Sequence, residues 1–183
     1  MNMRISFMEL FFPDYLKRKE LLELFRITAS AFQVPMPPVK GGSFKDVLHL
    51  FGVFTKEVAL QEISREEDVD PVKKRLYDGA FQIGRELRDR MRIRSSRDAV
   101  KAAKLLYRSI GIEFQCNKMG EVEICRCYFS AFYPREVCWI ISSIDQGIIA
   151  GLTEGARFWF LSRITEGSRS CVGQIEFKEI EQD

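Results

Sequence analysis

The chain has 183 residues, the length of one domain or of one domain with a short extension. Its 46% hydrophobic content is enough for a full core, and its net charge of +2 neither favours nor excludes an anionic partner. The single histidine, His49, excludes most histidine-based chemistry, because a Ser–His–Asp triad would have to use that one residue.

Composition also predicts the compartment. The five cysteines follow no regular framework, and the first residues lack the basic, apolar and small-residue order of a signal peptide. We therefore expect reduced thiols in a cytoplasmic protein with no membrane segment. Fifteen phenylalanines predict an aromatic core that leaves room for an apolar ligand.

The N-terminal part is predicted to be an extension, residues 1–42, followed by a domain over residues 43–183. Met1–Phe12 carries eight apolar residues out of twelve, and a helix is expected from Pro13 to about Phe32. Val34–Gly42 holds three prolines and two glycines and is predicted to be a linker. An apolar segment on such a linker favours a homodimer in which Phe11, Phe12 and Phe25 pack against a second copy.

Three more helices are expected after the linker. Ser43 with Asp46 has the spacing of a capping box, and Asp70–Pro71 is a typical helix start. Ser96 is expected to cap the last of these helices, and Gly111 is expected to end it. The arginines between Arg85 and Arg97 are interpreted as a solvated helix end, so a nucleic-acid partner is not expected.

After Gly111 the apolar period changes from 3.6 to 2, which predicts strands. Pairing Cys116 with Val122 and Phe114 with Ile124 leaves Lys118–Gly120 as a loop that ends in glycine, the geometry of a bulged hairpin. A second hairpin is expected over residues 157–165 and 170–178. The fold class is therefore α+β: about four helices, then hairpin–helix–hairpin, giving a four-stranded antiparallel sheet with helices packed on one face.

The helix between the hairpins, Glu136–Gly155, is predicted to be central. Its apolar residues recur at three- and four-residue steps, and Gly147, Gly151 and Gly155 follow one line along it. Because glycine weakens a helix, this line predicts another backbone in close contact. Asp145 and Glu136 interrupt the apolar run and exclude a bilayer-spanning helix.

The cysteines provide the candidate reactive groups. Cys125 and Cys127 alternate on a strand and are expected to point away from the core, unless a bulge intervenes. Cys138, in the first turn of the central helix, is a candidate for a lowered pKa, and Cys171 is expected to face the core. No zinc-type spacing is present, so no metal or other cofactor is expected; zinc on Cys127, Cys138 and Cys171 is the alternative.

Three passages resemble the 4-vinyl-reductase domain superfamily over roughly residues 71–178. LYDGAFQIGREL (76–87) is similar to its tyrosine-and-glycine helix, CWIISSIDQGIIAGLTEG (138–155) to its cysteine-led helix, and FLSRITEGSRSCVGQIEF (160–177) to its closing hairpin. The resemblance implies an apolar cavity between helices and sheet, a sensory role and dimerisation. Sensor members bind zinc; here Cys138 and Cys171 match two ligand places, but Arg163 replaces another.

The sequence thus predicts a module that binds a hydrophobic small molecule, with Tyr77, Phe81, Cys138, Trp139 and Cys171 lining the site. Whether it is an enzyme stays open at this point, with a non-enzyme favoured. The alternative function follows from similarity to 2-aminothiazoline-4-carboxylate hydrolase-like proteins, carried by CYFSAF (127–132) and EGSRSC (166–171). It is a hydrolase of a small sulfur-containing ring, with Cys127 or Cys138 as nucleophile or metal ligand.

Overall fold

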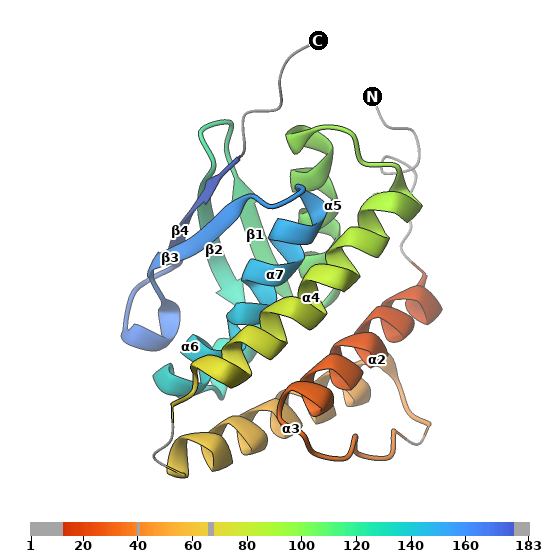
Figure 1. The fold of residues 1–183 in the computed structure, drawn as a ribbon, viewed down its shortest axis with the longest axis vertical. Helices are drawn as coiled ribbons and strands as arrows, with labels where there is room; N and C mark the ends of the chain where they lie inside the picture. Colours follow the sequence, from red (N-terminus) through yellow and green to blue (C-terminus); the bar gives the residue numbers. More distant parts are fainter. Residues whose placement is uncertain (1–12, 40, 66–67, 178–183) are drawn as a thin grey trace.

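The computed structural model describes residues 13–39, 41–65 and 68–177, and it has the α+β architecture expected from the sequence (Figure 1). The Met1–Phe12 segment lies outside the described residues. The longer helices are α2 (Asp14–Ala31), α3 (Phe44–Ser64), α4 (Asp70–Met91), α5 (Ser96–Ser109) and α7 (Ser143–Leu152). The strands are β1 (Ile112–Cys116), β2 (Glu121–Cys127), β3 (Arg157–Ser162) and β4 (Cys171–Glu176); the short helices are η1 (Tyr128–Ala131), α6 (Arg135–Ile141) and η2 (Ile164–Glu166).

The four strands form one antiparallel sheet in the order β1-β2-β4-β3. Buried and exposed residues alternate along β1 and β4, so one face of the sheet is covered by helices and the other faces solvent. The predicted pairs Phe114–Ile124 and Cys116–Val122 are confirmed, and Gly120 has the positive φ of 80° that the bulged hairpin needs.

Helix α4 lies directly against α7, and glycines make the close contact possible. A Cβ on Gly147 would lie 2.8 Å from Ala80 Cβ, and one on Gly151 would lie 2.7 Å from the backbone nitrogen of Arg85. On the facing helix, a Cβ on Gly84 would lie 3.0 Å from Gly151 Cα. The predicted close approach of a second backbone is therefore confirmed. Gly155 lies beyond the end of α7, with φ 102°.

The central helix differs from the prediction because it is two helices, α6 and α7, that meet at Ser142. The Ser142 hydroxyl donates to the carbonyl of Trp139 at 3.0 Å and accepts from Arg163 at 3.3 Å. A serine hydroxyl bonded to a carbonyl of the preceding turn competes with the helical backbone, which accounts for the break.

Helix α2 packs into the same core as α3 and α4. The Phe25 ring is fully buried, with its centroid 5.0 Å from that of Phe51 and 5.7 Å from that of Phe54. The expectation that Phe25 packs against a second copy is therefore wrong; Phe11 and Phe12 lie outside the described residues. The domain boundary at residue 42 and the homodimer itself stay predictions.

Helix capping follows the sequence closely. The Ser43 and Asp46 side chains form the complete capping box at the start of α3. At α5 the cap is Ser95, one residue earlier than predicted, and its hydroxyl accepts from the backbone N–H of Asp98.

No helix in the described ranges combines the length and apolar content needed to cross a bilayer.

Candidate functional site

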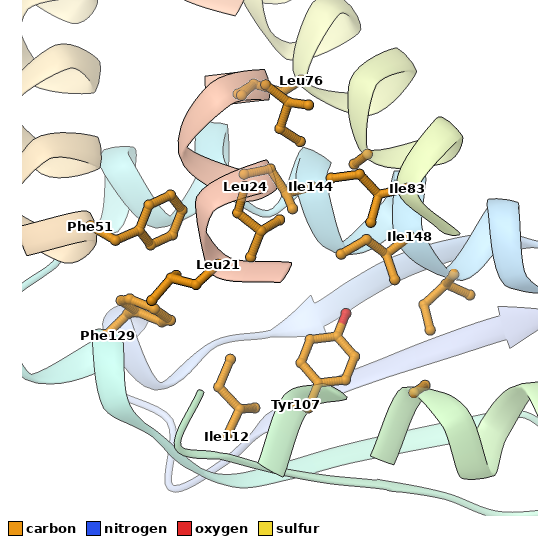
Figure 2. Packing of buried hydrophobic residues seen from close by; sticks show 14 of the residues in the cluster. Leu21, Leu24, Phe51, Leu76, Ile83, Tyr107, Ile112, Phe129, Ile144 and Ile148 are labelled. Atoms are coloured by element: carbon orange, nitrogen blue, oxygen red, sulfur yellow. The ribbon is translucent and has the colours of Figure 1, made fainter. Parts of the chain in front are cut away.

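A cavity of about 90 Å³ lies between the helices and the covered face of the sheet. Figure 2 shows side chains from several elements around this space, among them Phe51, Tyr107 and Ile148. The lining residues are Leu24, Phe51, Tyr107, Ile110, Ile112, Ile124, Cys127, Phe129, Ser130, Tyr133, Cys138, Ile141, Ser142, Ile144, Asp145, Ile148, Phe160, Arg163, Thr165 and Cys171. The lining is mostly apolar, with a few hydroxyls, three thiols, one carboxyl and one guanidinium.

Two of the five predicted site residues, Cys138 and Cys171, line this cavity. Tyr77 and Phe81 are not among the lining residues; their rings stack on each other along α4, with centroids 6.3 Å apart. Trp139 is 43% exposed, and the Lys73 ammonium lies 3.6 Å from its ring centroid. The helix and strand periods directed Cys138 and Cys171 toward the covered face of the sheet, but the helix period did not distinguish the cavity side of α4 from its other sides.

A bulge explains why Cys127 also reaches the cavity. The register between β1 and β2 shifts between Ile112 and Phe114, so Cys127 pairs with Ile112. The shift turns Cys127 toward the helices while Cys125, two residues earlier, stays exposed. Cys125 therefore points outward, as expected. Cys127 does not, because the strand contains the bulge that the prediction named as its exception.

Tyr107 and Asp145 form a hydrogen-bonded pair at the cavity that the sequence did not predict. The Tyr107 hydroxyl donates to Asp145 Oδ1 at 2.9 Å, and both residues line the space. Burial is the main cause that raises the pKa of Asp145 to about 6, opposed by the Tyr107 hydrogen bond and by the charge of Arg163. The signal was present, since Asp145 is the carboxylate that interrupts the apolar stripe of the central helix.

Arg163 brings a positive charge to the same cavity. Its side chain is only 12% exposed, and its guanidinium lies 4.8 Å from the Phe160 ring centroid and 3.6 Å from Glu166 Oε1. One Nη donates to Ser142, whereas Nε is buried and has no hydrogen-bond partner in the described part of the chain. A buried donor without an acceptor is costly, so a molecule that offers an acceptor here would recover that cost.

Burial raises the pKa values of the three cavity thiols. The pKa of Cys127 rises to about 12, and desolvation also raises the pKa values of Cys138 and Cys171. The lowered pKa predicted for Cys138 is therefore wrong, because desolvation outweighs the effect of its position in a short helix. These thiols are protonated at neutral pH, which does not favour a cysteine nucleophile.

Within residues 13–39, 41–65 and 68–177, no three His, Cys, Asp or Glu side chains form a metal-binding group.

Asp145 gives a pH-dependent prediction. The pKa of its carboxyl is about 6 in the folded protein, above the ~3.9 of the unfolded chain. The free energy of unfolding therefore falls by on the order of 3 kcal/mol as the pH rises from about 4 to about 6. Asp145→Asn removes this loss. We expect the variant to resemble wild type near pH 4 and to be more stable above about pH 6. Urea unfolding across this range, with Asp89→Asn at an exposed position of α4 as control, tests it; a difference independent of pH would contradict it.

Two arginines at the end of α4 bond to residues at the end of α7 and in α2. Arg88 donates to the carbonyl of Leu152 at 3.0 Å and pairs with Glu154 at 2.9 Å. Arg90 pairs with Glu20 of α2 at 2.7 Å. These contacts support the structural interpretation of the cluster.

Comparison with known proteins assigns the chain to no family. The chain matches no protein-family model and none of the curated proteins.

Proposed function

We propose that the protein is a binding module for a small, mostly apolar molecule held in the cavity between the helices and the sheet. One observation carries this proposal: a mostly apolar cavity lies beside a buried guanidinium that keeps an unpartnered N–H. Apolar walls with a few placed polar groups are typical of small-molecule sites. The 4-vinyl-reductase resemblance, the dimer and the cytoplasmic location are parts of this proposal that stay predictions.

Cavity size limits the ligand. The volume of about 90 Å³ is below the ~300 Å³ at which ordinary ligand pockets begin. An engineered apolar cavity of ~150 Å³ binds benzene. We therefore propose a ligand of about one ring, whose entry moves the surrounding side chains slightly.

The polar groups define the rest of the ligand. Arg163 offers N–H donors, and the Asp145 carboxyl, already bonded to Tyr107, offers an acceptor when ionised. Because guanidinium binds carboxylate in a favourable geometry, a ring with one carboxylate is the ligand class that these groups support best.

Filling the cavity tests the proposal. Toluene and benzoate serve as probes, and Cys127→Leu adds bulk at the lining while Cys125→Leu adds the same bulk on the exposed side of the same strand. At saturating probe we expect a higher melting temperature for wild type and Cys125→Leu, because ligand at ~100 times its Kd adds about 2.7 kcal/mol. Cys127→Leu should show no increase.

The polar end of the site is tested with Arg163→Met. We expect it to keep the toluene effect and to lose any advantage of benzoate over toluene. A melting temperature that neither probe raises in wild type, or that both raise equally in Cys127→Leu, would contradict the proposed site.

A further inference from the structure

A second, independent feature is a groove between α5 and β1, on the edge of the sheet. It consists of two adjoining hollows of about 760 and 640 Å³ that share Lys104. The first hollow is lined by consecutive residues from Gly111 to Gln115, and the second continues past Cys116 to Lys118. The groove therefore follows the whole of β1, and Figure 1 shows α5 beside this strand.

The groove is strongly basic. Its charged lining residues are Arg97, Lys101, Lys104, Arg108, Lys118 and Arg126 against one carboxylate, Glu113. Arg97, Lys101, Lys104 and Arg108 recur at four- and three-residue steps and so share one side of α5. This stripe contrasts with the net charge of only +2 for the chain.

The basic residues of α5 differ from several of those of α4. Lys73, Lys74 and Arg88 of α4 each pair with a carboxylate at 3.3 Å or less. In the described part of the chain, the four basic residues of α5 have no carboxylate within ion-pair distance. The only acid in α5, Asp98, is at the cap, where its backbone N–H donates to Ser95. Positive charge without acidic neighbours favours an anionic partner from outside the fold.

Strand β1 forms the other wall of the groove. It is the outermost strand, paired with β2 on one side only in the described sheet. The other side of an edge strand carries backbone N–H and C=O groups that pair with an added strand. A groove that follows this edge admits an extended chain.

We propose that this groove binds an extended acidic peptide segment of a partner protein, which adds to β1 as a fifth strand while its carboxylates contact the basic stripe of α5. Main-chain hydrogen bonds to β1 supply affinity, and charge pairing with Lys101 and Lys104 selects acidic sequences. A nucleic acid is the less favoured occupant, because sequence-tolerant single-strand sites use aromatic stacking, and no fully exposed aromatic ring lines the described groove.

The test uses a fluorescein-labelled peptide of eight residues in which glutamate and valine alternate, at ~50 mM salt. We expect saturable binding that Lys101→Glu with Lys104→Glu weakens by about tenfold or more. The matched control, Lys19→Glu with Lys45→Glu, reverses two exposed charges on α2 and α3 and should change affinity less than about twofold. A lysine–valine peptide should not bind.

Strand addition has its own readout. Proline in place of two central valines removes backbone donors and should abolish binding, and the bound glutamate–valine peptide should slow amide hydrogen exchange in residues 112–116. The proposal is overturned if the peptide does not bind at ~200 μM, or if the Lys101/Lys104 reversal has no effect. Equal binding of the proline peptide, or tighter binding of a twelve-nucleotide single-stranded DNA through the same lysines, also overturns it.

Discussion

Replacing Gly151 with valine is expected to lower the free energy of unfolding by about 3 kcal/mol or more. A Cβ at this position would lie 2.7 Å from the backbone nitrogen of Arg85 and 2.9 Å from the carbonyl carbon of Gly84. Both neighbours are backbone atoms of a long helix, so they do not give way as a flexible side chain does. The added side chain must therefore separate α4 from α7, and urea unfolding measures the loss.

The control for this variant is Gly41→Val. A Cβ on Gly41 meets nothing within 4 Å, so we expect stability within about 0.5 kcal/mol of wild type. Equal stability of the two valine variants would show that α4 and α7 are not in backbone contact.

Removing the Phe25 ring is expected to cost about 3–5 kcal/mol of unfolding free energy. The ring is fully buried between Phe51 and Phe54 of α3, so Phe25→Ala leaves a cavity that helices α2 and α3 cannot easily close. The cost should be the same at low and high protein concentration, because the contacts lie within one chain.

Tyr15→Ala on the same helix is the matched control, since Tyr15 is 71% exposed. We expect a change of less than about 0.5 kcal/mol. A destabilisation by Phe25→Ala that disappears at high protein concentration would instead place α2 in an interface between copies.

The sequence predicts most of the architecture because local signals agree with the fold. The capping box at Ser43, the hairpin register at Phe114–Ile124 and the glycine line at Gly147 and Gly151 each depend on near neighbours, and each is confirmed. The break at Ser142 was missed because serine also occurs in uninterrupted helices, so the apolar spacing does not show that its hydroxyl bonds to the carbonyl of Trp139.

The site was harder to predict than the fold. Cys138 and Cys171 could be directed toward the covered face of the sheet from sequence, because their positions in a helix and a strand fix the direction of each side chain. Tyr107 and Arg163 were missed as lining residues because only the tertiary packing brings them to Asp145 and Ser142. Cys127 reaches the cavity through a bulge whose position the alternating pattern cannot specify.

The most direct test of the cavity as a ligand site is a titration of the protein with toluene, followed by NMR of isoleucine methyl groups. Ile124, Ile144 and Ile148 line the cavity, whereas Ile27 is equally buried, packs against Gly79 of α4 and is not a lining residue. We expect saturable shifts at the three lining residues and no shift at Ile27. Shifts that do not saturate, or that are as large at Ile27 as at the cavity, would contradict the proposed function.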